Sequence, residues 1–465
     1  MAGPSLWFDE AYEFWASNVP FSQLSHEVIK TYQPPLYNYV AHFWLMIGHS
    51  AFSFRLLSVL INVIAISILI RWYYELTRTK SAWIIGLIAV FFPSDIRYAQ
   101  EAAEYALMYT FLVAFIYAFW VALTKQKQNF FIFAAIFATM SALSQYGSML
   151  VIIAIASTSS IYAFYKKNRP LVRQLSLFWS LFFIPTVSIL YFFLPYQIQR
   201  QDLGRTILVI QNFRAELANL FNALEKLSLF GMTGYSANLI YNYYAISLFF
   251  LIIAFTVILA FHKNTQFIFR IVSLWLLSCL AIYFISVRVG IYGYGNFGNR
   301  YGIIVYPIMH ISWAITFYHL MRVKISNTII KYFIKLLVLM LFSFIPFSIM
   351  ILNSPSRLLI DLLTLEQVKS TQNASINQNV EPIKEIFFYW SKHRQDGQKT
   401  FIFYGAAPAF AYYYKINTLG QSDLARTWDT PCANYKYCDS ENIVFGEGFR
   451  SYFDNVTLNI CSVAK

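Results

Sequence analysis

The chain has 465 residues, of which 58% are hydrophobic, 19% are aromatic and only 12% are charged. Soluble domains carry a charged fraction of about 25%. The composition therefore excludes an ordinary soluble protein and predicts a polytopic membrane protein. Four cysteines are too few for a disulfide scaffold or a zinc ribbon, and the sequence contains no CxxC, HExxH, P-loop or GxGxxG motif.

The first 52 residues form a polar and aromatic leader that begins with two adjacent acids. Asp9 and Glu10 follow the aromatic pair Trp7-Phe8. Acids are scarce in so apolar a chain, and a charged pair at the mouth of a membrane domain is a functional candidate. The alternative is a solvated loop in which Asp9 caps a helix. Further along the leader, residues 36–47 predict an amphipathic helix that lies along the membrane interface.

Ten apolar runs follow, each near the length that crosses a bilayer. They are residues 53–74, 81–96, 104–123, 130–145, 148–165, 175–195, 241–261, 267–287, 301–320 and 332–352.

The charges of the connecting loops predict the orientation of these spans. Five alternate loops carry fifteen Lys and Arg residues and one acid, Glu75, which makes these loops cytoplasmic by the positive-inside rule. The net charge of +13 thus reflects topology and does not indicate nucleic-acid binding. The leader and the tail after Leu352 are then extracytoplasmic, at a plasma (inner) membrane. Because an outside leader normally follows a spanning helix or a signal peptide, we expect one transmembrane helix to be missing before Asp9.

Three external segments join these spans. Residues 93–105 carry several charges, and residues 197–240 are expected to lie on the membrane surface. Residues 289–300 are rich in glycine and tyrosine, which suits either close approach to a ligand or an ordinary mobile loop.

The chain ends in a segment that predicts a small extracytoplasmic α/β domain, residues 353–465. Within it, residues 400–405 predict a buried strand and residues 406–415 predict a helix. Cys432 and Cys438 could close a small disulfide loop. The predicted organisation is a transmembrane domain with external catalytic loops over residues 1–352, followed by this appendage.

Several motifs, taken in order, resemble the GT-C superfamily of polytopic glycosyltransferases, in its protein O-mannosyltransferase-like branch with bacterial relatives that modify lipid A or polysaccharide. The matching stretches are Leu6-Trp7-Phe8-Asp9-Glu10-Ala11, Pro34-Pro35-Leu36-Tyr37, His42-Phe43-Trp44, Phe54-Arg55-Leu56-Leu57-Ser58, Tyr98-Ala99-Gln100-Glu101-Ala102, Arg300-Tyr301 with Pro307, and Tyr404-Gly405 with Pro408 and Tyr413. The resemblance covers nearly the whole chain.

The chain departs from the family pattern at three positions. Gln33 stands where the family usually has histidine, Ala103 where it has arginine, and Glu104 where it has an apolar residue. These departures put in doubt the role of that imidazole and one phosphate-binding charge, and they weaken any inference about the substrate.

The resemblance implies an inverting transfer of a monosaccharide from a polyprenyl-phosphate sugar to an acceptor hydroxyl of a protein, lipid or polysaccharide. Such a displacement needs a base for the hydroxyl proton and positive charge at the departing phosphate. We expect Asp9 to be the base and Glu10 to orient the acceptor or Asp9. The expected donor phosphate-binding residues are Arg97, Arg300 and Arg55, and the expected substrate-binding residues are Glu101, Glu104, Tyr37 and Tyr301.

Other interpretations of these charged residues stay open. Each arginine could instead reach lipid phosphates or pair with Asp95 or Glu101, and Glu101 and Glu104 could simply favour a helix start. Because the spacing of the external acids and histidines matches no metal motif, we expect neither a metal nor another cofactor. The expected partners are the lipid-linked sugar, membrane lipid and a hydroxyl acceptor, with no nucleic acid.

Three further functions compete with the glycosyltransferase hypothesis. A polysaccharide polymerase or O-antigen ligase also uses polyprenyl carriers, but an early acidic pair followed by Pro-Pro-Leu-Tyr is not expected there. A lipid-sugar transporter needs charges in the middle of its spans, whereas the acids here lie at span ends and in loops. A catalytically degenerate relative remains an alternative because of the departures at Gln33 and Ala103.

Overall fold

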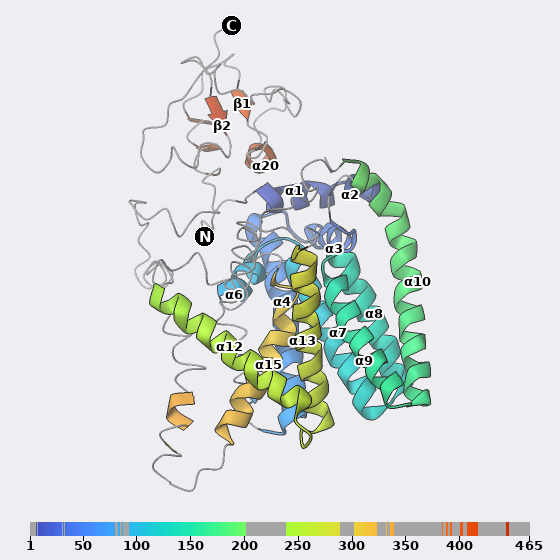
Figure 1. Cartoon of the computed structure of the whole chain (residues 1–465). Coiled ribbons are helices and arrows are strands. Elements are labelled where there is room, and N and C mark those ends of the chain that lie inside the picture. Colours follow the sequence, from blue (N-terminus) through green and yellow to red (C-terminus); the bar gives the residue numbers. More distant parts are fainter. Residues whose placement is uncertain are drawn as a thin grey trace. The chain divides into compact units, whose positions relative to one another are not determined.

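The computed structural model is built mainly of helices (Figure 1). It describes residues 6, 8–29, 31, 33–79, 82–83, 86, 93–200, 239–288, 302–322, 332, 335–338, 384, 387–388, 391–392, 400–402, 407–416 and 443–445. Arg300, Tyr301 and the cysteines at 432 and 438 lie outside these residues, as do most of the predicted external segments 197–240 and 289–300. Contacts divide the chain into two compact units.

The first unit combines most of the leader with the C-terminal part of the chain, as residues 1–27, 38–56 and 368–465. Its leader helices are α1 (Phe8–Ser17), α2 (Phe21–Val28) as far as Glu27, and α3 (Leu36–Leu45) from Asn38 onward. The start of α4 (Ala51–Thr77) also belongs to this unit. Helix α3 lies where the amphipathic helix was predicted, whereas α1 and α2 are additional helices in the leader.

The C-terminal part of this unit contains two short strands and a helix. Strand β1 (Thr400–Ile402) pairs in parallel with β2 (Ile443–Phe445), with Thr400 opposite Ile443. Helix α20 (Ala407–Ile416) follows β1. This strand and this helix lie at the positions predicted for them, while a separate domain over residues 353–465 stays a prediction.

The second unit holds the apolar helices, within residues 28–37 and 57–367. After α4 these are α6 (Pro93–Gln100), α7 (Tyr105–Lys125), α8 (Gln128–Ser144), α9 (Ser148–Tyr165), α10 (Arg169–Arg200), α12 (Leu239–Phe261), α13 (Phe267–Arg288) and α15 (Tyr306–Met321). Helix α7 lies at the centre of this unit's core, since nearly all of its side chains are buried.

The lengths and composition of these helices make the chain a multi-pass membrane protein. Among the described residues, five helices are long and apolar enough to span a bilayer: α4, α7, α9, α10 and α13. Helices α8 and α12 provide shorter apolar segments. The predicted count of ten spans stays a prediction.

Three of the basic loops predicted to be cytoplasmic begin in the same way. Arg78, Gln126 and Lys167 have φ values of 54°, 51° and 52°, each within two residues after the end of a helix. A left-handed residue at this point reverses the chain direction and closes the last helical turn. Basic side chains nearby also favour the negative end of the helix dipole. The charges that predicted the orientation therefore also favour the local structure of these turns.

The predicted end of the second span at Ile96 is wrong, because this residue lies inside helix α6. The second span was expected to end at Ile96, and an external segment was expected to begin at Pro93. The structure instead has one continuous helix from Pro93 to Gln100. Proline is favourable in the first turn of a helix, where its missing N–H has no partner to lose.

Polar side chains join α9 to α13 inside the apolar core. Ser159 Oγ donates to the Ile155 carbonyl at 2.8 Å and accepts from Trp275 Nε1 at 2.9 Å. One hydroxyl thus satisfies an indole N–H that is removed from solvent.

We expect Ser159→Ala to lower the thermal stability of the purified protein, because it leaves the buried N–H of Trp275 without its acceptor. The cost of such a group is about 1–3 kcal/mol. Ser176→Ala is the control, since that exposed hydroxyl donates to the Val172 carbonyl of its own helix at 3.0 Å. Equal melting temperatures for the two variants would contradict this account of the helix contact.

Candidate active site

The acidic pair of the leader lies in the first turn of α1, which begins at Phe8. Negative charge is favourable there because the N-terminus of a helix carries partial positive charge. Asp9 is partly exposed, whereas Glu10 is only 1% exposed. Adjacent acids of the same helix therefore occupy different environments, and Asp9 lies inside the helix rather than capping it.

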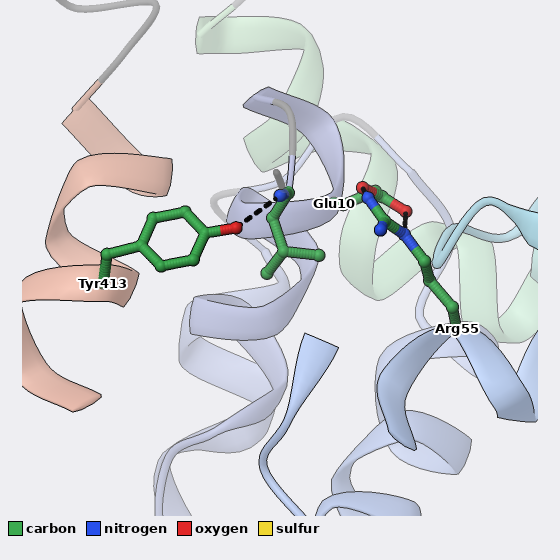
Figure 2. Close-up of polar contacts among 4 residues, drawn as sticks. Glu10, Arg55 and Tyr413 are labelled. Atoms are coloured by element: carbon green, nitrogen blue, oxygen red, sulfur yellow. Dashed lines mark hydrogen bonds and ion pairs between the residues drawn. The ribbon is translucent and has the colours of Figure 1, made fainter. Parts of the chain in front are cut away.

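Glu10 is bound by Arg55 from the start of α4. Arg55 Nε donates to Glu10 Oε1 at 2.7 Å, and Nη2 donates to Oε2 at 2.5 Å. Figure 2 shows the two side chains facing each other with both contacts formed. This fork geometry is the strongest form of a carboxylate–guanidinium pair. The structure therefore brings together two of the predicted site residues. Arg55, which was predicted to bind the donor phosphate, binds the carboxylate of Glu10.

A second buried acid on α1, Glu13, was not among the predicted site residues. Asn38 of α3 donates through Nδ2 to Glu13 Oε2 at 2.5 Å and to Ser17 Oγ at 3.2 Å. His42, one turn further along α3, contacts the carbonyl oxygen of Ser17 through Nδ1 at 2.9 Å. The sequence signal that could have identified Glu13 is its spacing from Asp9 and Ser17, which places these three polar side chains on one face of a helix.

Burial raises the pKa of Glu13 to about 7, the hydrogen bond from Asn38 lowers it, and the charge of Asp9 adds to the increase. An acid with this pKa is partly protonated at neutral pH, unlike an ordinary exposed glutamate.

Helix α20 holds the beginning of α1 and the turn before α4. The hydroxyl of Tyr413 accepts a hydrogen bond from the backbone N–H of Leu6 at 2.8 Å (Figure 2). Tyr412 donates to the His49 carbonyl at 3.0 Å and packs edge-to-face on Phe14, with ring centroids 4.9 Å apart. The C-terminal part of the chain thus fixes α1 on both sides of its acidic turn.

In the second unit, a side chain of α10 contacts the segment that carries the Pro-Pro-Leu-Tyr motif. The carbonyl of Gln33 accepts from Gln197 Nε2 at 2.9 Å, and Gln197 Oε1 accepts from the Tyr146 hydroxyl at 2.5 Å. Tyr37 is buried. The contact between Gln197 and residue 33 thus involves the backbone carbonyl of Gln33. It does not depend on which side chain stands at this position.

Acidic side chains on α6 and in the segment that follows it are also buried in the second unit. Asp95 Oδ2 lies 3.0 Å from His310 Nε2, and His310 Nδ1 lies 3.1 Å from the Tyr109 hydroxyl. Glu101 and Glu104 are both buried. His310 was not predicted, although a histidine in the middle of an apolar run needs a polar partner and therefore signals a buried network.

These contacts do not test the roles predicted for the site residues. Arg97 lies on α6, but its side chain is outside the described residues. The catalytic and binding roles assigned from the sequence stay predictions. Within the part of the chain that the structure describes, no three His, Cys, Asp or Glu side chains are grouped as metal ligands.

We expect Arg55→Ala to destabilise the protein strongly, because it leaves the carboxylate of Glu10 buried without its partner. Breaking such a pair costs about 3–5 kcal/mol. Adding Glu10→Gln to this variant should recover part of the loss, because the buried charge is then removed. Thermal unfolding of the two single variants and the double variant measures this coupling.

The control for these variants is Arg173→Ala, which removes an exposed arginine from α10. It should leave the melting temperature nearly unchanged. Additive effects of Arg55→Ala and Glu10→Gln would mean that the two side chains do not stabilise each other.

Comparisons with known proteins agree with the resemblance of the motifs. Residues 32–196 match the family model of dolichyl-phosphate-mannose-protein mannosyltransferases. The crystal structures of ArnT from Cupriavidus metallidurans, bound to undecaprenyl phosphate and in the apo state, are 11% identical to this chain with a TM-score of 0.47. The alignments cover 89% of this chain and 71% and 70% of those chains. At this identity and score the similarity does not establish a common fold, and no curated protein matches the sequence. Residues 32–196 are therefore similar to the dolichyl-phosphate-mannose-protein mannosyltransferases, in agreement with the resemblance of the motifs to the protein O-mannosyltransferase-like branch of the GT-C superfamily.

Proposed function

We propose that this protein is an inverting glycosyltransferase that moves a monosaccharide from a polyprenyl-phosphate sugar to an acceptor hydroxyl. The family model supports the reaction class, because its members are described as using a dolichyl-phosphate-linked sugar. Dolichyl phosphate belongs to the same class of long-chain isoprenoid phosphates as the proposed donor. The family model therefore supports this class of donor, and it identifies neither the sugar nor the acceptor of this protein.

The observation that carries the assignment of the base is the contrast between the two acids in the first turn of α1. Glu10 is buried and its two oxygens are held by Arg55. Asp9 is partly exposed at the same end of the helix. A general base must reach a proton on its substrate, so the more accessible carboxylate suits this role. Glu10 then acts by fixing the turn that carries Asp9.

The proposed reaction is a single displacement at the anomeric carbon. The acceptor oxygen forms a bond to this carbon while its proton moves to a carboxylate oxygen of Asp9. The bond between the anomeric carbon and the phosphate oxygen breaks, and polyprenyl phosphate departs with the electron pair. Attack opposite the leaving group inverts the configuration of the sugar. Positive charge at the departing phosphate is needed, and Arg97 and Arg300 are the proposed sources.

We expect Asp9→Asn to cut turnover by about 10²-fold or more, because an amide cannot accept the proton at neutral pH. Expression and donor binding should stay near those of the wild type. The assay incubates purified protein with radiolabelled polyprenyl-phosphate sugars and follows sugar release or transfer.

Glu27→Gln is the matched control, since it removes a carboxylate of the leader outside the acidic turn. It should keep wild-type activity. A fully active Asp9→Asn protein would exclude Asp9 as the base. Wild-type protein that neither releases nor transfers sugar from any donor tested would count against the proposed function itself.

The proposed location of the reaction is the extracytoplasmic face of a plasma (inner) membrane. The support is the concentration of basic residues in five alternate loops, which favours a cytoplasmic position for those loops. The leader and the tail then lie on the opposite side.

Protease added to intact spheroplasts should therefore cleave the tail that follows residue 352 and leave the basic loops uncut. An epitope at the C-terminus makes the cleavage visible on a blot. Protection of the epitope until the membrane is opened would reverse the proposed orientation.

A further inference from the structure

The imidazole of His310 joins three helices of the second unit. Its Nε2 lies 3.0 Å from Oδ2 of Asp95 on α6, and its Nδ1 lies 3.1 Å from the hydroxyl of Tyr109 on α7. All three side chains are buried, and the proposed reaction uses none of them. Because a buried polar group without a partner is unfavourable, these two contacts tie α6 and α7 to α15, the helix that carries His310.

Helix α6 is held at a second point by Tyr98. The centroid of its ring lies 5.0 Å from that of Tyr105 at the start of α7. Tyr98 is buried like Asp95, and residues three apart share one face of a helix. Two buried contacts on one face leave a short helix little freedom to rotate about its axis. Asp95 and Tyr98 together therefore set the rotation of α6.

Arg97 lies between these two buried residues in the sequence. Residues one or two positions apart do not share a face of a helix, so position 97 lies off the buried face of α6. It shares a face with Gln100, which is exposed. Helix α6 therefore carries position 97 on its accessible face as long as Asp95 and Tyr98 hold the opposite face in the core.

Of the two contacts that hold α6, the one made by Asp95 depends on a polar partner. Burying a carboxylate is unfavourable unless it is paired, and among the described residues the imidazole of His310 is its partner. Without that imidazole, we expect Asp95 to move toward water and α6 to rotate with it. The orientation of α6 therefore depends on a histidine more than 200 positions away in the sequence.

We propose that His310 is a positioning residue for donor binding: by holding Asp95, it fixes the rotation of α6 that presents Arg97 to the phosphate of the polyprenyl-phosphate sugar. This inference rests on the proposed function, in which Arg97 supplies positive charge at the departing phosphate. It extends that function by giving the buried contact between Asp95 and His310 a role in binding the donor. The effect of His310 on the phosphate must then depend on Arg97.

The experiment measures the binding of two lipids to the purified protein in detergent. One is undecaprenyl phosphate, and the other is undecaprenol, which lacks the phosphate. The ratio of the two dissociation constants reports the contribution of the phosphate and requires neither sugar, acceptor nor turnover. Wild type should prefer the phosphate, and Arg97→Ala should reduce this preference by about tenfold, the size of one hydrogen bond to a charged group.

Two substitutions of His310 offer the same amide at different reach. Glutamine can place its amide nitrogen near the position of Nε2, whereas that of asparagine reaches only as far as Nδ1. His310→Gln should therefore keep the contact with Asp95 and most of the preference for phosphate. His310→Asn should lose about tenfold, as Arg97→Ala does. Asp95→Ala should show the same loss, and it removes the buried charge together with the contact, so no acid is left unpaired.

Ser159→Ala is the control that separates positioning from a loss of stability. It breaks a buried hydrogen bond between α9 and α13 of the same unit, so it should melt earlier and keep the wild-type preference for phosphate. The double variant of His310→Asn with Arg97→Ala should lose no more preference than Arg97→Ala alone, because His310 acts through Arg97.

The outcomes separate this inference from the proposed function. Equal preference for phosphate in wild type, His310→Asn and Asp95→Ala would overturn the inference and leave the proposed function intact. Equal losses in His310→Gln and His310→Asn would overturn it as well, as would losses that add in the double variant. If wild type shows no preference for the phosphate, the donor proposed for this protein is wrong, and the inference fails with it.

Discussion

The ion pair between Glu10 and Arg55 is the constraint on which the acidic end of the chain depends. Helix α1 carries three acids in ten residues, and two of them are buried. Because both oxygens of Glu10 are bound by one guanidinium, the rotation of α1 about its axis is fixed relative to the start of α4. That rotation places Phe14, one turn after Glu10, against Tyr412 of α20. A buried pair is weak evidence for net stability, because removing both charges from water offsets much of their attraction.

The same rotation gives three carboxyl groups of one short helix three different environments. Glu10 is paired with Arg55, Glu13 is buried beside a neutral amide, and Asp9 is partly exposed. Accessibility and pairing therefore differ among three acids that lie within two turns of one helix. The chemistry proposed for Asp9 therefore follows from how its neighbours are held, since an isolated aspartate in a loop would show no such division.

Much of the helical fold could be predicted because apolar length is a strong local signal, as α7 and α9 show. Charge placement and motif order made Asp9, Glu10 and Arg55 candidate site residues. The pairing of Arg55 with Glu10 could not be predicted, because it joins residues 45 positions apart and leaves no local pattern. The spacing of Asp9, Glu13 and Ser17 placed Glu13 on one face of a helix, but it did not show that Glu13 is buried or that Asn38 is its partner. His310 was missed for a similar reason, since its partner Asp95 belongs to a distant helix.

The most direct test of this account is a structure of the protein with a polyprenyl phosphate bound, determined at a resolution that shows the side chains of α1 and α4. The account predicts that Arg55 keeps both contacts to Glu10 and that Asp9 stays accessible to the bound donor. A lipid phosphate bound by the guanidinium of Arg55, with Glu10 released, would contradict it and would make Arg55 a ligand of the leaving group.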